Sequence, residues 1–303
     1  MIIHRRLLPL LALSVLLAGC GSSSSGDLAP GARPPSDRLV DLDAKPPLVN
    51  ALDIDPASGD FLLTTNRGFF RIGAKDQKVT QIKGTISAEG KTDTVGTFLE
   101  IETEGENRLI GSGHPDNQDT LPQFLGFIES TDSGKTWKVL ARLGDADLHK
   151  IVTLHDKIYA FDAVLGAILI SSDNGKTFEE RFTPRGLVID FVVDPQDEKY
   201  LLAATEDQLF KTEDAGERWR PVTSGEGIRL EWTATGVFRA DKDGTINLST
   251  DRGATFTPVG KVDGEPYKFK ATEDPDKLFL ALSDGTILET TDAGKTWKPV
   301  FTP

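Results

Sequence analysis

Short apolar runs recur along the chain in an order that predicts β-strands. The runs of one unit are residues 187–193, 200–205, 208–212 and 219–222, and an equivalent set lies in residues 267–301. β-branched and aromatic residues dominate these runs, and Gly, Pro and Asp separate them, as is typical of strands joined by turns. The pattern therefore predicts repeated units of four antiparallel strands.

An eight-residue motif lies between the third and fourth runs of five units. Its pattern is Ser/Thr-x-Asp-x-Gly-x-Thr-Trp/Phe, with Arg218 in place of Thr in the third copy. The Asp, Gly and aromatic positions are Asp132, Gly134 and Trp137; Asp173, Gly175 and Phe178; Asp214, Gly216 and Trp219; Asp251, Gly253 and Phe256; and Asp292, Gly294 and Trp297. We expect the aspartate to accept hydrogen bonds from backbone N–H groups one or two residues on, the glycine to adopt positive φ, and the aromatic ring to be buried. These roles are structural, because one active site does not need five copies of the same group.

The spacing of the motif predicts the architecture. Its aspartates are 41, 41, 37 and 41 residues apart, and a period of about 40 residues in a β-rich chain is typical of a propeller. A sixth unit, residues 49–82, has the same runs around a degenerate motif. A strand near Leu39–Val40 is expected to help close the ring. We therefore predict an all-β, six-bladed β-propeller with four-stranded antiparallel blades over residues 38–303.

The motif resembles the Asp-box, or BNR, repeat of sialidases and of many propellers that are not enzymes. The resemblance covers roughly residues 49–301 and implies the fold, whereas one fold serves many functions. Phe70-Arg71-Ile72 is similar to a sialidase substrate-binding motif but lacks its proline and precedes the degenerate box, so we interpret Arg71 as structural. Tyr267 and Glu231 begin or lie in innermost strands, where they are expected to face the central channel.

The start of the chain predicts a lipid anchor. Two arginines precede an apolar stretch, residues 7–17, that is too short to span a bilayer as a helix. Leu17-Ala18-Gly19-Cys20 resembles a bacterial lipobox, which implies a signal peptide at residues 1–19 and lipidation of Cys20. Residues 20–37 predict a flexible linker rich in Gly, Ser and Pro. The resemblance implies a chain anchored at the outer face of the cytoplasmic membrane, or in the outer membrane facing the periplasm or the exterior.

The net negative charge of the chain limits the classes of partner that it can bind. The formal charge is −13, and removal of residues 1–19, with their two arginines, makes it −15. Such a chain repels the phosphate backbone of nucleic acids and lacks a general polybasic attraction to anionic lipids. We therefore expect a monomer with an envelope protein or glycan as its partner, held to the membrane by its lipid.

Two loops depart from the repeat on the face expected to lie opposite the Asp-boxes. Residues 113–123 are longer than the equivalent loops of other units, and residues 144–149 link the second unit to the third. Long loops in compact repeats are often functional. The side chains that we expect to form one ligand-binding site are His114, Asp116, Asp119, Asp145, Asp147 and His149. The alternative interpretation is a solvated insertion whose aspartates cap turns.

These observations leave two functions open. The first is a lipid-anchored binding or assembly module. The second is a sialidase-like glycoside hydrolase in which two of Asp116, Asp145 and Asp147 act as acid and base, if they lie about 5–9.5 Å apart. No cofactor is expected, although the polar group has the residue types that bind a divalent metal such as calcium. A related lineage of Asp-box propellers acts in photosystem II assembly through basic surface residues, and because this chain is acidic that role is not transferred.

Overall fold

The computed structural model describes residues 47–225 and 228–303. The predicted signal peptide, the linker, Cys20 and the strand near Leu39–Val40 lie outside the described residues. Within those that are described, no helix is long and apolar enough to cross a membrane.

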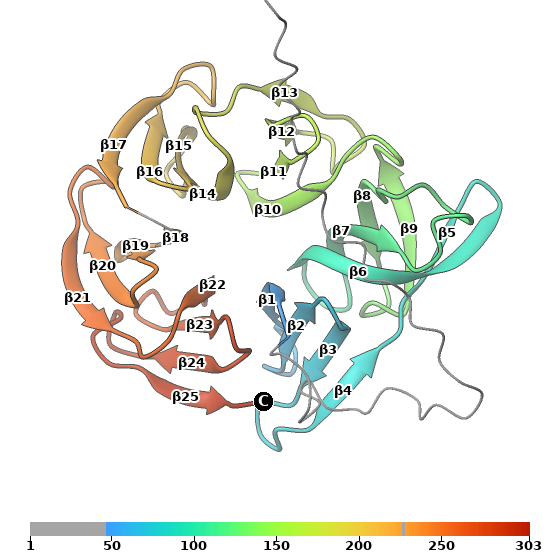
Figure 1. Ribbon diagram of the computed structural model, residues 1–303, viewed down its shortest axis with the longest axis horizontal. Coiled ribbons are helices and arrows are strands. Elements are labelled where there is room, and N and C mark those ends of the chain that lie inside the picture. The colour runs from blue at the N-terminus through green and yellow to red at the C-terminus, as the bar shows by residue number, and fades with distance from the viewer. Residues whose placement is uncertain (1–46, 226–227) are drawn as a thin grey trace, which may run out of the picture. The chain divides into compact units, whose positions relative to one another are not determined.

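The described chain forms six blades around a central channel (Figure 1). Blade 1 contains β1 (Val49–Ile54), β2 (Phe61–Thr65), β3 (Gly68–Ile72) and β4 (Val79–Ile82); blade 2 contains β5 (Thr85–Ala88), β6 (Lys91–Thr103), β7 (Leu109–Pro115), β8 (Phe127–Ser130) and β9 (Thr136–Ala141); and blade 3 contains β10 (Leu148–Leu154), β11 (Lys157–Asp162), β12 (Ala167–Ser171) and β13 (Glu179–Arg181). Blade 4 contains β14 (Val188–Asp194), β15 (Asp197–Thr205), β16 (Gln208–Thr212) and β17 (Arg220–Ser224); blade 5 contains β18 (Arg229–Thr233), β19 (Gly236–Ala240), β20 (Thr245–Ser249) and β21 (Thr257–Lys261); and blade 6 contains β22 (Pro266–Ala271), β23 (Leu278–Leu282), β24 (Ile287–Thr290) and β25 (Lys298–Phe301). The innermost strands β1, β6, β10, β14, β18 and β22 follow one another around the channel. The predicted six-bladed propeller is confirmed.

Among the described residues, blades 1 and 6 meet through side chains to close the ring. All four strands of blade 1 come from the start of the described chain and all four of blade 6 from its end, so these two sheets share no strand. Phe61 and Phe279 pack edge to face with ring centroids 5.0 Å apart. They belong to one hydrophobic cluster that draws its residues from both blades. Gln77 also donates a side-chain hydrogen bond to the carbonyl of Val300.

Blade 2 has one strand more than predicted. β5 pairs antiparallel with β6 and parallel with β9, so the sheet closes on itself. β6 serves both the added hairpin and the inner strand because the β6–β7 pairing shifts its register twice, between Val95 and Thr97 and between Phe98 and Glu100. The polar first half of β6 hid this extension from the pattern of apolar runs.

The box of blade 2 shows the geometry of the repeat. The Ser130 hydroxyl donates to Asp132 Oδ1 over 2.9 Å and accepts from the Gly134 amide over 2.9 Å. Asp132 accepts from the Thr136 amide at 2.8 Å and from its hydroxyl at 2.7 Å. The backbone donor therefore lies four residues on, and the expected offset of one or two was wrong, because the turn contains two residues with positive φ, Ser133 at 59° and Gly134 at 86°.

Burial of the box aromatic residues differs between blades. Trp137 is 3% exposed, packs 5.0 Å from the ring of Phe98 and donates from Nε1 to the Gly134 carbonyl. The other four, Phe178, Trp219, Phe256 and Trp297, are half-buried. Trp137 lies inside β9, which β5 and β8 flank, whereas each of the others precedes its strand.

The two faces of the ring carry different loops. The hairpins after the innermost strands bond to the boxes: Ser133 N to Asn107 O, Ala215 N to Lys199 O, and Ala293 N to Asp276 O. On the other face the links between blades bond to loops between second and third strands: Gly144 N to Phe124 O, and Ala163 N to Asp147 O. The two loops singled out in the sequence therefore lie opposite the Asp-boxes.

Candidate functional site

Two histidines flank one carboxylate at the channel mouth opposite the boxes. His114 Nε2 lies 3.1 Å from Asp147 Oδ1, and His149 Nε2 lies 3.1 Å from Asp147 Oδ2. An ionised carboxylate only accepts hydrogen bonds, so each Nε2 carries the proton that it donates. Neither Nδ1 has a hydrogen-bond partner among the described residues.

Three strand features place these side chains. His114 lies near the end of β7, and its ring packs edge-on against Phe124 with centroids 5.7 Å apart. His149 is the extra residue of a bulge at the start of β10, where the pairing shifts between Leu148 and Lys150. A bulge changes the direction of a side chain, and here it leaves 48% of the His149 side chain exposed.

The pKa of Asp147 lies well below its usual range. Burial alone would raise it, but the hydrogen bonds and charges of His114 and His149 outweigh burial. Asp147 therefore stays ionised well below neutral pH. A carboxyl group that holds no proton in this range is a poor general acid, since the pKa of an effective acid lies near the working pH.

The structure does not bring the other three predicted side chains into this group. Asp116, Asp119 and Asp145 are exposed. Their backbone amides bond locally, to Thr94 O, Asn117 Oδ1 and Arg142 O respectively. Among the residues described, no group of three or more His, Cys, Asp or Glu side chains is arranged to hold a metal ion.

Asp162, which the sequence did not reveal as a site residue, holds the link between blades 2 and 3 in place. It is fully buried, and its Oδ1 accepts from the amides of Asp147 at 3.2 Å and Val164 at 2.9 Å. Its Oδ2 has no hydrogen bond in the described structure and lies 3.8 Å from Nη2 of Arg142. The signal in the sequence was an aspartate directly after an apolar run, residues 158–161.

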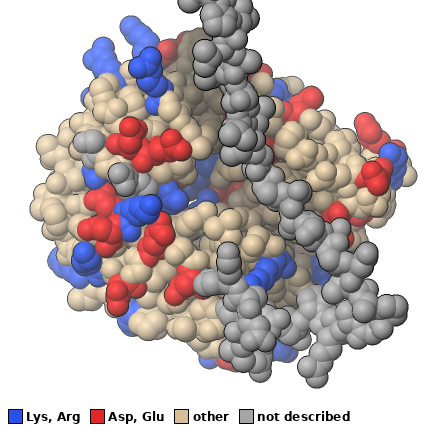
Figure 2. Space-filling view, in the orientation of Figure 1, with Lys and Arg blue, Asp and Glu red and all other residues tan. Residues whose placement is uncertain are grey.

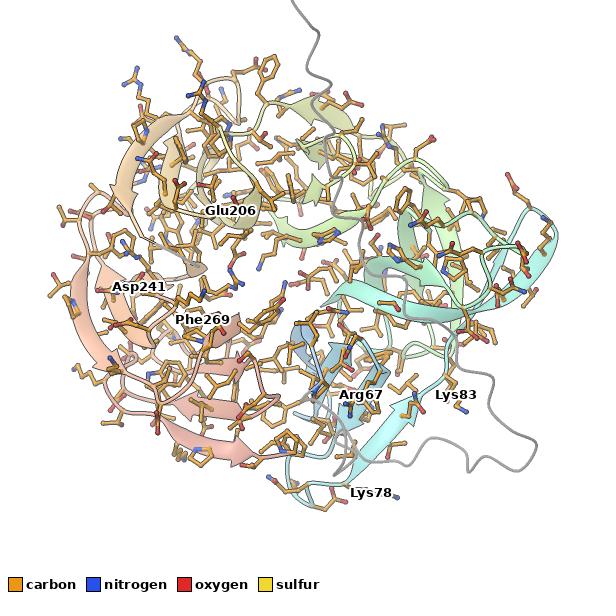
Figure 3. All side chains as sticks on the ribbon, in the orientation of Figure 1. Arg67, Lys78, Lys83, Glu206, Asp241 and Phe269 are labelled. Atoms are coloured by element: carbon orange, nitrogen blue, oxygen red, sulfur yellow. The ribbon has the colours of Figure 1, made fainter. Side chains whose placement is uncertain are left out.

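Below the mouth, every innermost strand contributes charge to the channel. We call this group the channel cluster: Asp53 (β1), Glu100 and Glu102 (β6), Lys150 (β10), Asp190 (β14), Glu231 (β18), and Lys268 and Lys270 (β22). Its ion pairs are Lys150–Asp190 at 3.3 Å, Lys268–Glu100 at 3.2 Å, Lys270–Asp53 at 2.8 Å and Lys270–Glu102 at 3.0 Å. Five carboxyl groups thus face three ammonium groups. Phe269, which separates the two lysines, packs in the core between blades 5 and 6 (Figure 3).

Burial in the channel raises the pKa of two carboxyl groups of the cluster. Burial raises the pKa of Glu102 to about 7, with Lys270 opposing this and Asp53 adding to it. Burial also raises the pKa of Glu231, against the charges of Lys150 and Lys270. Glu231 has no ion pair among the described residues, so it is the carboxyl group of the cluster without its own cation.

A cavity of about 160 Å³ lies in the channel beside this cluster. Glu231 and Trp232 line it, as does Pro195 toward the Asp-box face, so the prediction that Glu231 faces the channel is confirmed. Tyr267 does not line the cavity; its ring instead packs against the guanidinium of Arg229, 5.0 Å away. Arg71 forms ion pairs with Asp55 and Asp60 within its own blade, in agreement with a structural role.

Comparisons with known proteins identify the fold. No protein-family model matches the chain, and no curated protein matches it. A solved structure of YCF48 bound to D1 peptide is similar, with a TM-score of 0.54 and 16% identity over 84% of this chain and 82% of that one. PorZ, a surface component of the type-IX secretion system of Porphyromonas gingivalis, has a TM-score of 0.53 and 13% identity, covering 86% of this chain and 38% of its own. At such identities the similarity shows the propeller fold alone.

Proposed function

We propose that this chain is a lipid-anchored binding module of the cell envelope that captures a segment of a protein partner at the channel mouth. The observation that carries the proposal is the surplus of carboxyl groups there. The carboxylate of Asp147 lies at the mouth, and the channel cluster below has more carboxyl than ammonium groups. A partner that enters should therefore present donors, and a basic side chain fits best.

Two further points favour binding over catalysis. The residues considered as acid and base are poorly suited to these roles, because Asp145 and Asp116 are exposed and Asp147 is held ionised. A propeller also presents loops on a rigid ring, which suits recognition with little reorganisation. The structure of YCF48 bound to D1 peptide is a case in which a propeller of similar fold binds a peptide. The anchor itself is proposed from the lipobox-like residues that end at Cys20.

The test uses capture from an envelope extract. The full chain, its His149→Ala variant and a Lys295→Ala control would be immobilised, and bound proteins identified by mass spectrometry. Lys295 is exposed on the Asp-box face, so the control should retain the partner. His149→Ala should lose it with an unchanged melting temperature. Retention of the partner by His149→Ala would contradict the proposed site.

The glycosidase alternative has its own assay. The chain would be incubated with a panel of fluorogenic glycosides, including a sialoside, with and without calcium. We expect no turnover. Hydrolysis that disappears in an Asp145→Asn/Asp147→Asn variant would make the chain an enzyme and overturn the binding-module proposal.

A further inference from the structure

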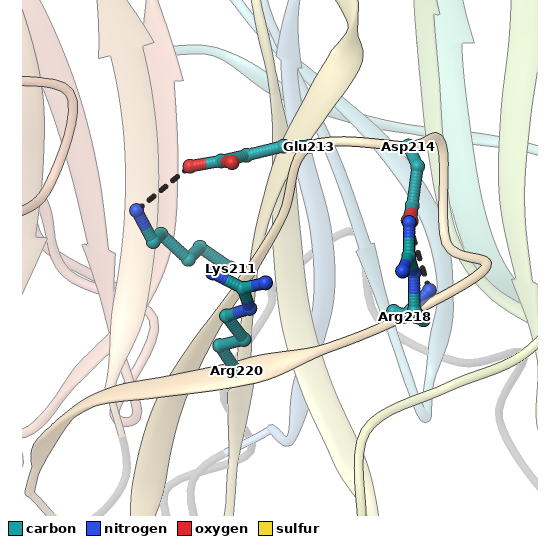
Figure 4. A pocket seen from close by; sticks show the side chains of 5 residues that line it. All are labelled: Lys211, Glu213, Asp214, Arg218 and Arg220. Carbon is teal, nitrogen blue, oxygen red and sulfur yellow. Dashed lines mark hydrogen bonds and ion pairs between the residues drawn. The ribbon is translucent and has the colours of Figure 1, made fainter.

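The outer edge of blade 4 carries a groove of about 190 Å³, away from the channel (Figure 4). Its lining residues are Lys211, Glu213, Asp214, Arg218 and Arg220. They come from β16, from the third Asp-box and from β17. Figure 2 shows one face of the ring, and where grey residues do not cover this face, acidic and basic side chains are interspersed.

Blades 2 and 6 place opposite charges at one pair of facing positions in these two strands, whereas blades 3 and 5 have Ile170–Glu179 and Leu248–Thr257 there. Glu129 on β8 lies directly opposite Lys138 on β9, and their side chains form an ion pair of 2.7 Å. Glu289 on β24 likewise lies opposite Lys298 on β25, with an ion pair of 2.9 Å. Opposite charges at directly facing positions stabilise a strand pair.

Blade 4 reverses this arrangement. At the equivalent positions, Lys211 on β16 lies directly opposite Arg220 on β17. Like charges that face each other across two strands destabilise the pair. Lys211 is partly compensated by Glu213, whose Oε1 lies 2.9 Å from Nζ. Arg220 is exposed and has no ion pair or hydrogen bond from its side chain within the described part of the chain.

The third box adds a second departure at the same place. In the other four boxes a threonine hydroxyl donates to the box aspartate at 2.6–2.7 Å. Here Arg218 Nε makes that bond to Asp214 Oδ2 at 2.8 Å. The turn is therefore satisfied by Nε alone, and the terminal nitrogens of Arg218 remain on a side chain that is 80% exposed.

We propose that this groove binds a phosphate group. Three cations face two carboxylates, each carboxylate already holds one cation, and Arg220 is left with its full set of donors. Guanidinium groups match the geometry of phosphate oxygens and bind them in pairs of hydrogen bonds. The groove is smaller than the roughly 300–1,000 Å³ of sites for drug-sized ligands, which suits a small oxyanion. This function goes beyond the capture of a partner at the channel mouth and uses a different surface.

Protection of an exposed edge strand is the competing explanation, since charged side chains prevent edge-to-edge association. The Glu289–Lys298 pair of blade 6 places charge on its edge strand, β25, without facing like charges. Protection therefore accounts for charge on β17 but not for the reversal at Lys211.

The experiment titrates inorganic phosphate into the full chain in detergent, at constant ionic strength, by isothermal titration calorimetry. The wild type should show saturable binding, and Arg220→Gln should weaken it about tenfold, the loss expected for one charged hydrogen bond. Lys211→Glu restores the pattern of blades 2 and 6, so it should raise the melting temperature and abolish binding. Arg218→Thr restores the box sequence and should weaken binding with the fold intact. The matched control, Lys298→Gln, should bind as the wild type does.

A second experiment distinguishes a lipid headgroup from a soluble phosphate as the ligand. Flotation would compare the full chain and Arg220→Gln on phosphatidylcholine vesicles with and without phosphatidylglycerol. An Arg220-dependent preference for phosphatidylglycerol would assign a lipid headgroup, and calorimetric binding without such a preference would assign a soluble phosphate. Both support the site. Absence of saturable phosphate binding together with no Arg220-dependent vesicle preference, or equal weakening in Arg220→Gln and Lys298→Gln, would overturn it.

Discussion

Removal of the Lys270 ammonium should destabilise the whole ring. Its Nζ lies 2.8 Å from Asp53 Oδ1 and 3.0 Å from Glu102 Oε1, and the Asp53 side chain is fully buried. Asp53 also accepts from the amide of Thr103 at 2.5 Å, so it joins blade 1 to blade 2 while Lys270 joins both to blade 6. Lys270→Met keeps most of the volume but leaves two carboxyl groups without their cation.

The expected cost is about 3–5 kcal/mol, the range for breaking a buried ion pair by removing one partner. Urea denaturation at neutral pH, with unfolding followed by tryptophan fluorescence, measures it. Asp53→Asn in the Lys270→Met background should recover part of the loss, because a neutral amide needs no cation. A loss below about 1 kcal/mol, or a double variant no more stable than Lys270→Met alone, would refute the reasoning.

Three further changes test other parts of the ring. Trp137→Ala should cost roughly 3–5 kcal/mol, as the loss of a buried aromatic ring does; an unchanged melting temperature would show that the box of blade 2 needs no aromatic residue. Arg252→Ala should cost about 1–3 kcal/mol in denaturant, because the buried carboxylate of Asp194 loses its 2.6 Å bond to Nε. Glu102 has a folded pKa of about 7, above its ordinary value of 4.5, so the folded state binds the proton more tightly and this residue's contribution to stability should fall as pH rises from 4.5 to 7. Melting temperatures of Glu102→Gln across that range should fall less with pH than those of the wild type.

The repeat made the architecture predictable. Each Asp-box fixes one turn, and the aspartate spacing counts the blades, so the number and order of strands follow from local chemistry. The added strand β5 was not predictable in this way, because its pairing with β9 joins segments about 50 residues apart. The first half of β6, which pairs with β5, is polar. Strands were predicted from apolar runs, so this half gave no signal.

The site was predictable in part. Loop length and the rarity of histidine led to His114, Asp147 and His149, which the structure brings together. The channel cluster was missed apart from Glu231, because its members are scattered over six strands with only one or two on each. Only closure of the ring makes neighbours of Asp53 and Lys270, and no local pattern records that distance. Ligand binding by the three mouth residues stays a prediction.

The seam between blades 1 and 6 implies that the chain could begin at another blade and still form the same ring. Because the described blades share no strand across it, this junction is a packed interface of the same kind as those joined by a peptide link. Circular permutants that begin at Asp263 or Gly186, both in links between blades, with the old ends tethered, should therefore fold into the same ring. A pulling force on residues 47 and 303 should likewise part the ring at the seam first and leave each blade intact.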